Sequence, residues 1–146
     1  MDWTIEFDKA IEQYLPDLEV LQDEPMSRHT TFRIGGPAKR MAFPSSREQL
    51  VLLMSFAKNY GANPLVIGNG SNLLVPDEGL DRLVIDTSAN LNRVERGSEN
   101  TVLADAGATL ARTADLACKL GLAGLEFAHG IPGTVGGGVC MNAGAY

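Results

Sequence analysis

The stretch Gly130-Ile-Pro-Gly-Thr-Val-Gly-Gly-Gly-Val-Cys-Met-Asn-Ala-Gly-Ala-Tyr146 holds six of the 16 glycines of the chain and no charged side chain. Glycine adopts positive φ angles readily and lets the backbone approach a ligand closely. We expect this segment to wrap a ligand and then to begin a helix near Thr134, whose positive end would lie near a phosphate. Close packing of a helix on a sheet also requires small residues, and it is the alternative explanation.

A second glycine-rich segment, Gly68-Asn-Gly-Ser-Asn72, follows the short apolar run 65–67. It has the form of a phosphate loop, in which glycine N–H groups and the side chains of Ser71 and Asn72 bind a pyrophosphate. It is neither a Walker A loop nor a Rossmann fingerprint, because it lacks the Lys of the first and the third Gly of the second. An Asn-Gly hairpin turn fits the same residues, so the residues alone leave both interpretations open. The two glycine segments together suggest a large phosphate-bearing ligand that is held by main chain rather than by Lys or Arg.

The composition is that of a globular protein, with 45% apolar and 21% charged residues among 146. A net charge of −6 without a basic cluster argues against binding to nucleic acid or to an anionic membrane surface. We see no signal peptide and no apolar run of about 20 residues, so we expect a cytoplasmic location. We expect Cys118 and Cys140 to be reduced, partly buried thiols. His29 and His129 stand too far apart to suggest a metal site.

Apolar periodicity and capping residues predict a mixture of helices and strands. Helices are expected at 2–15, after a capping box at Ser45-Ser-Arg-Glu48, after Thr109 and, more briefly, at 122–128, with Gly61 and Gly121 ending the second and third. Strands are expected at 30–34, 38–43, 65–67, 83–85 and 101–104, and a loop at 23–26. This alternation predicts an α/β or α+β fold. The polar stretch 86–100 suggests a boundary between two subdomains.

The sequence shows no pair of residues suited to nucleophilic or acid–base catalysis. Asp105 and Glu126 have no acidic partner at a useful spacing, and we expect surface or capping roles for them. Ser71 has no neighbouring His and does not lie in a nucleophile elbow.

Four stretches of this chain resemble, in order and spacing, the UDP-N-acetylenolpyruvoylglucosamine reductases (UDP-N-acetylmuramate dehydrogenases) of bacterial cell-wall synthesis. They are His29-Thr-Thr-Phe-Arg-Ile-Gly-Gly-Pro-Ala38, Val66-Ile-Gly-Asn-Gly-Ser-Asn-Leu-Leu74, Gly121-Leu-Ala-Gly-Leu-Glu-Phe-Ala-His-Gly-Ile-Pro-Gly-Thr-Val-Gly-Gly137 and Met141-Asn-Ala-Gly-Ala-Tyr146. The first stretch is the hallmark of the second type of this reductase. The resemblance extends from about residue 21 to residue 146.

This resemblance implies an α+β, FAD-binding fold of the vanillyl-alcohol-oxidase (PCMH) type with two α/β subdomains, the second incomplete. It divides the chain into an N-terminal helical segment at 1–20, a first subdomain at 21–88 and a second at 89–146, with a C-terminal substrate domain absent. In the family, NADPH reduces the FAD, and flavin N5 then passes hydride to the enolpyruvyl group of the UDP-sugar. The product, UDP-N-acetylmuramate, is used in peptidoglycan synthesis.

The resemblance also assigns residues to the cofactor. It implies that the FAD phosphates are bound by Ile67, Gly68, Asn69, Gly70, Ser71, Asn72 and Leu73. It implies that the pyrophosphate and isoalloxazine region is lined by Ile131, Pro132, Gly133, Thr134, Gly136, Gly137, Asn142, Gly144 and Ala145. No His or Cys stands in or beside residues 68–72, so we expect the FAD to be bound non-covalently.

No residue of this chain matches the serine, arginine and glutamate that carry out the chemistry in the family, and residue 146 falls inside a family motif. We therefore expect a part of a longer protein that binds FAD without turnover and self-associates through exposed apolar surface. Two alternatives remain open. One is the FAD module of another oxidoreductase of the same flavoprotein superfamily, and the other is a nucleotide-binding or interaction module without redox chemistry.

Overall fold

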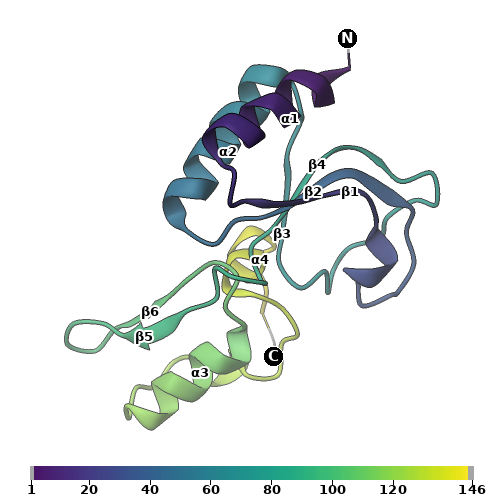
Figure 1. The fold of residues 1–146 in the computed structure, drawn as a ribbon. Coiled ribbons are helices and arrows are strands. Elements are labelled where there is room, and N and C mark those ends of the chain that lie inside the picture. Colours follow the sequence, from purple (N-terminus) through teal and green to yellow (C-terminus); the bar gives the residue numbers. More distant parts are fainter. Residues whose placement is uncertain (1, 145–146) are drawn as a thin grey trace.

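The computed structural model describes residues 2–144, which form two groups of elements that follow each other along the chain (Figure 1). The first group comprises α1 (Trp3–Tyr14), β1 (Glu19–Pro25), β2 (Pro37–Phe43), α2 (Arg47–Tyr60), β3 (Leu65–Ile67) and β4 (Leu80–Asp86). The second comprises β5 (Val94–Arg96), β6 (Val102–Ala104), α3 (Leu110–Lys119) and α4 (Val135–Cys140). Single 3-10 turns lie at Met26–Arg28 and Glu126–Ala128.

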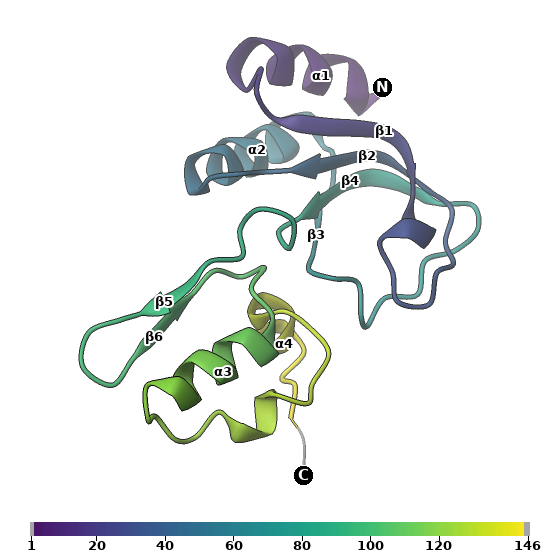
Figure 2. The same cartoon turned by 60° about the horizontal axis from the view of Figure 1, so that its bottom comes forward.

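The first group is built on a sheet with strand order β1-β2-β4-β3, in which β1 and β2 are antiparallel and the other neighbours are parallel. Successive side chains of a strand point to opposite faces. Leu83 and Ile85 of β4 therefore pack under α1 and α2, in one apolar cluster with Phe7 and Leu53. Val84 between them faces the other side of the sheet. Figure 2 shows this group beside the hairpin of β5 and β6, which lies next to α3 and α4.

Two connecting segments, 26–36 and 68–79, cover the face of the sheet opposite the helices. They run side by side, since the Thr31 N–H donates to the Gly70 carbonyl at 3.2 Å and the Gly36 N–H to the Pro76 carbonyl at 2.9 Å. Met26 and Val75 from these segments are buried against the strands. This face of the sheet is therefore covered by loops rather than by helices.

The strand predicted at 30–34 is wrong, because these residues form a turn. The Arg33 N–H donates to the Thr30 carbonyl at 3.1 Å, and the Thr30 hydroxyl donates to the Ile34 carbonyl at 3.0 Å. Arg33 has φ +55°, a left-handed conformation that costs a non-glycine residue about 1 kcal/mol. Local hydrogen bonds of a threonine side chain here replace the ladder bonds of a strand.

The loop predicted at 23–26 is also wrong, because Asp23 to Pro25 belong to the edge strand β1. The strand β5 was not predicted either. The box at the start of α2 is displaced by one residue from the prediction: Ser46 accepts from the Gln49 N–H at 3.1 Å, and the Gln49 side chain accepts from the Ser45 N–H at 2.8 Å.

Most other elements lie where they were predicted. The helix at 2–15 and the strands at 38–43, 65–67, 83–85 and 101–104 are confirmed, within a few residues at their ends. Thr109 caps α3 by accepting from the Arg112 N–H at 3.2 Å, and Gly61 ends α2 with φ +72°. The stretch 122–128 contains a single 3-10 turn in place of the expected short helix.

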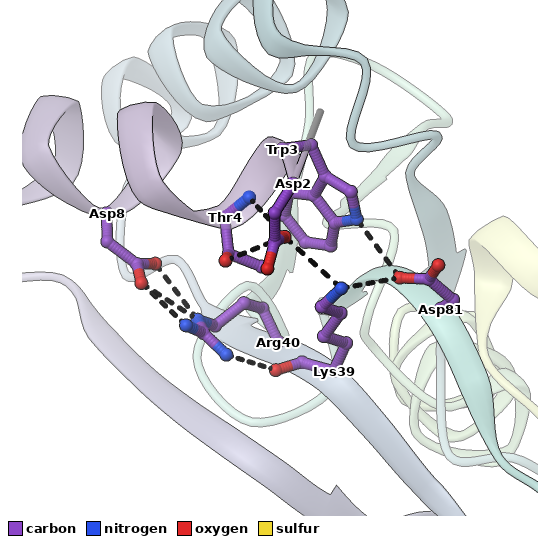
Figure 3. A network of polar contacts seen from close by, with 7 residues as sticks. All are labelled: Asp2, Trp3, Thr4, Asp8, Lys39, Arg40 and Asp81. Atoms are coloured by element: carbon purple, nitrogen blue, oxygen red, sulfur yellow. Dashed lines mark hydrogen bonds and ion pairs between the residues drawn. The ribbon is translucent and has the colours of Figure 1, made fainter.

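A polar network fastens α1 to the sheet (Figure 3). The Arg40 guanidinium on β2 donates to both carboxylate oxygens of Asp8, at 2.9 Å from Nε and 2.6 Å from Nη2, and Asp8 raises the pKa of Arg40. Lys39 lies between the carboxylates of Asp2 at 3.2 Å and Asp81 at 3.1 Å. The Trp3 indole N–H also donates to Asp81 at 3.2 Å. The helix is thus held to two strands by charge as well as by its apolar face.

Within residues 2–144, no helix is both long and apolar enough to cross a bilayer. Cys118 and Cys140 carry free thiols that are exposed, so the expectation that they are partly buried is wrong.

Candidate functional site

The two glycine segments come together beyond the carboxyl end of β3, where α4 begins (Figures 1 and 2). The Ser71 hydroxyl donates to the Pro132 carbonyl at 3.0 Å. A Cβ atom on Gly68 would lie 2.7 Å from Cγ2 of Thr134, closer than side-chain atoms approach, so only glycine fits at this contact. Five of the predicted site residues therefore meet at one place: Gly68, Ser71, Pro132, Gly133 and Thr134.

The segment 68–72 is not a hairpin turn. A tight hairpin joins antiparallel strands, whereas β3 and β4 are parallel neighbours, so residues 68–79 form a crossover connection between them. The hairpin alternative is therefore wrong. The carboxyl ends of parallel strands are also where α/β folds commonly bind their ligands.

The segment 68–72 offers main-chain donors. Within the described residues, no hydrogen bond is formed by the N–H groups of Asn69, Gly70, Ser71 and Asn72. Asn69 and Asn72 are exposed, while Gly70 is buried beneath the carbonyl of His29. A row of N–H groups that the fold leaves without acceptors is suited to an anionic ligand such as a phosphate.

The helix predicted near Thr134 is present, but its first N–H groups are already used. The Val135 N–H donates to the Ala108 carbonyl at 2.7 Å, and the Gly136 N–H donates to the Ala106 carbonyl at 2.8 Å. Thr134 is buried, and its hydroxyl oxygen accepts from the Gly137 N–H at 3.3 Å. The expectation that this helix end presents its N–H groups to a phosphate is therefore wrong. Close packing, the alternative, explains the small residues here.

Other predicted site residues lie further from this junction. Asn142 follows the carboxyl end of α4, where its N–H donates to the Val139 carbonyl at 3.2 Å. The six residues of α4 span about 9 Å, so Asn142 and Gly144 lie at the opposite end of the helix from Thr134. Ala145 lies outside the described residues.

Two predicted residues flank the loop with their side chains turned into the core. Ile67 is 4% exposed, and its carbonyl accepts from the Thr87 N–H at 3.1 Å and from the Thr87 hydroxyl at 2.9 Å. Leu73 packs against the cluster on the loop-covered face of the sheet. Both anchor the ends of the loop, and their side chains are not placed to contact a ligand.

Asp105 and Glu126 have the structural roles that were expected of them. Asp105 accepts from the Arg93 N–H at 2.9 Å, and Glu126 accepts from the Gly124 N–H at 2.8 Å. Both carboxylates fix turns in the second group of elements.

A second wall of the site was not predicted. Residues 28–31 and 33 line a cleft of about 350 Å³ together with Gly68, Asn69, Asp86 and Ser88. Arg28 and Arg33 thus line the same cleft as the first residues of the glycine loop. Neither arginine was predicted as a site residue, because the basic residues at 28, 33, 39 and 40 are too dispersed in the sequence to form a basic stripe. The positive charges at 28 and 33 beside two threonines were the available signal.

Residues 38–146 match the family model described as "FAD binding domain". The UDP-N-acetylenolpyruvoylglucosamine reductase of Agathobacter rectalis is 47% identical over an alignment that covers 96% of this chain and 48% of that protein. The protein of the same name from Moorella thermoacetica is 51% identical over 127 residues, which cover 87% of this chain and 41% of that protein. The chain therefore spans less than half the length of these curated relatives.

Solved structures of flavoenzymes share the fold. Alkyldihydroxyacetonephosphate synthase superposes with a TM-score of 0.72 at 21% identity, over 97% of this chain and 29% of that one. Cholesterol oxidase from Brevibacterium sterolicum gives 0.67 at 19% identity, over 90% and 26%. The predicted α+β architecture of the vanillyl-alcohol-oxidase type is confirmed by this similarity.

Proposed function

This chain belongs to the FAD-binding domain family, and from that premise we propose that it is the cofactor-binding part of a UDP-N-acetylenolpyruvoylglucosamine reductase. The observation that carries the proposal is the row of N–H groups at 69–72, which have no acceptor within the described residues and lie beside the segment 132–134. Relatives with 41% to 51% identity that bear this name support the choice over another flavin oxidoreductase.

The residues at the junction fit the phosphates of FAD. The segment 69–72 supplies main-chain donors without a charged side chain, and Ser71 and Thr134 hold the two glycine segments in contact. We assign to the cofactor the residues 67–73, 131–134, 136, 137, 142, 144 and 145. When bound, FAD supplies hydride transfer. The chain's own contribution is to bind and orient the cofactor.

For the whole protein we propose the activity of the reductase: hydride from NADPH reduces the enolpyruvyl group of the UDP-sugar to give UDP-N-acetylmuramate for peptidoglycan synthesis, in the cytoplasm. We assign no catalytic residue to this chain. Its organisation in this proposal is a helical segment at 1–20, a first FAD-binding subdomain at 21–88 and a second at 89–146, with substrate recognition elsewhere in the longer protein.

Titration of the purified 146-residue chain with FAD tests the proposal. We expect saturable quenching of flavin fluorescence and a flavin absorbance spectrum that remains with the protein on gel filtration. Binding of another dinucleotide in place of FAD would contradict the proposal and favour a non-redox module. We expect no NADPH oxidation in the presence of the UDP-sugar, so turnover by this chain alone would contradict the assignment of catalysis to other residues.

We also propose that the isolated chain self-associates. Several large apolar side chains are well exposed, among them Phe32 at 61%, Leu74 at 74% and Val139 at 78%. Phe32 and Leu74 belong to the two segments that run side by side over the sheet. Such surface favours association. Light scattering that shows a monodisperse monomer at high concentration would contradict this.

A further inference from the structure

The cleft at residues 28–33 and the glycine loop is lined by two cationic side chains, although the chain as a whole is acidic. The chain carries a net charge of −6, yet two of its arginines, Arg28 and Arg33, line this cleft of about 350 Å³. Gly68 and Asn69 line the same cleft, and the N–H group of Asn69 is the first of the row without an acceptor. Cationic side chains and a free main-chain donor in one cleft make a site suited to an anion.

The one acidic residue among those that line the cleft is engaged in its own turn. Oδ1 of Asp86 accepts from the Ser88 N–H at 2.7 Å, from the Ser88 hydroxyl at 2.7 Å and from the Ala89 N–H at 3.3 Å. These three donors partly neutralise the carboxylate and fix it at the carboxyl end of β4. Arg33 is therefore the one arginine in the lining of the cleft that has no carboxylate partner within the described residues.

The two arginines differ in whether they form an ion pair within the protein. Arg28 lies 3.5 Å from the Glu24 carboxylate, which also bonds the His29 ring at 3.0 Å, so its charge is partly used within the protein. Arg33 forms no ion pair with any described residue, and its left-handed backbone is fixed by the hydrogen bonds of Thr30. A strained backbone conformation that is held in place by its neighbours often marks a residue with a functional role.

We propose that Arg33 contacts the diphosphate of the nucleotide cofactor and thereby sets the preference of this site for a dinucleotide over an uncharged flavin. The identification of the diphosphate as that of FAD rests on the proposed function; the anion site itself does not. A guanidinium group binds phosphate oxygens through a planar pair of N–H donors. The free N–H group of Asn69, which lines the same cleft, would donate to the same anion.

The test compares the wild-type chain with Arg33→Gln, Arg33→Lys and a control, Arg96→Gln, at an exposed position of β5. Dissociation constants are measured for FAD and riboflavin by fluorescence, and for ADP and adenosine by calorimetry, at several salt concentrations. We expect R33Q to weaken FAD and ADP about tenfold or more. Riboflavin and adenosine should be unaffected, and the salt dependence of FAD binding should become shallower. R33K should fall between wild type and R33Q, and R96Q should match wild type.

The proposal is overturned if R33Q binds FAD and ADP as wild type does. It is equally overturned if R33Q loses riboflavin and FAD by the same factor, because that pattern indicates damage to the fold rather than loss of a phosphate contact. Wild-type chain that fails to bind FAD but binds ADP, with loss in R33Q, would refute the proposed function and support the anion site. Wild-type chain that binds neither nucleotide would refute both.

Discussion

Ser71 and Pro132 are separated by 61 positions in the sequence, yet the Ser71 hydroxyl donates to the Pro132 carbonyl at 3.0 Å. This hydrogen bond joins the loop after β3 to the segment before α4, and so joins the two groups of elements at the place where the free N–H groups lie. The two glycine segments are thus in direct contact, as the proposed cofactor site requires.

Replacement of Ser71 by alanine removes this link. We expect a loss of about 1 kcal/mol in the free energy of unfolding, the usual contribution of one hydrogen bond, and a several-fold weaker affinity for FAD because the loop is less well fixed. Urea denaturation and flavin titration measure the two effects. The control is Ser55→Ala on the exposed side of α2; if both variants behave alike, the link does not matter.

Gly68→Ala should lower the stability of the fold more than Ser71→Ala does. The added methyl group would fall 2.7 Å from Cγ2 and 3.0 Å from Cβ of Thr134, so the two segments would have to move apart. Overpacking of this kind costs about 1–3 kcal/mol, and we expect FAD binding to be lost with it.

Gly130→Ala is the matched control for that substitution, because a Cβ atom there has no neighbour within 4 Å. Thermal melts and FAD titrations of the two variants check the prediction. Equal stability of the two would show that the junction tolerates a methyl group and that the contact between Gly68 and Thr134 is not tight.

The ion pair of Arg40 with Asp8 should contribute to stability. The Arg40 side chain is 10% exposed, so Asp8→Ala would leave a nearly buried guanidinium without its carboxylate. We expect a loss of about 2 kcal/mol in the free energy of unfolding, measured with urea. Lys9→Ala, which breaks the exposed pair of Lys9 with Glu6, should change stability by less than about 0.5 kcal/mol. Equal effects would show that burial does not distinguish the two pairs.

The elements that could be predicted from sequence are those specified by their own residues. Thr109 caps α3 through its neighbour Arg112, and Gly61 ends α2 with a positive φ, so both limits are local. The strand β1 depends instead on its pairing with β2 along one edge. Its half-exposed residues show no clear alternation, so the sequence gives little sign of it.

The segment 30–34 has the composition of a strand but forms a turn. Its threonines, phenylalanine and isoleucine are typical of a strand, but the Thr30 hydroxyl bonds the carbonyl of Ile34 and closes a turn instead. For the candidate site, the glycine content indicated the two segments. Their contact, and the presence of Arg33 in the same cleft as Gly68, depend on tertiary structure. The hydrogen bonds of the first N–H groups of α4 could not be predicted either, because their acceptors lie at residues 106 and 108, far from α4 in the sequence.

The contacts of Asp81 with Lys39 and Trp3 make the attachment of α1 to the sheet dependent on pH. The Lys39 ammonium and, to a smaller extent, the Trp3 indole N–H lower the pKa of the Asp81 carboxyl below its ordinary value of 3.8. The unfolded chain therefore binds this proton at a higher pH than the folded chain does. The contribution of Asp81 to stability is complete above about pH 4 and is lost as the pH falls through its folded pKa.

Melting temperatures of wild type and Asp81→Asn between pH 7 and pH 2.5 test this coupling. We expect the variant to melt at a lower temperature than wild type at pH 7 and the difference to narrow as the pH falls, because wild-type Asp81 is then increasingly protonated. The exposed Asp17, which forms no ion pair within residues 2–144, provides the control Asp17→Asn, whose curve should run with wild type throughout. A constant gap between wild type and Asp81→Asn at all pH values would mean that the carboxylate's charge is not what fastens α1 to the sheet.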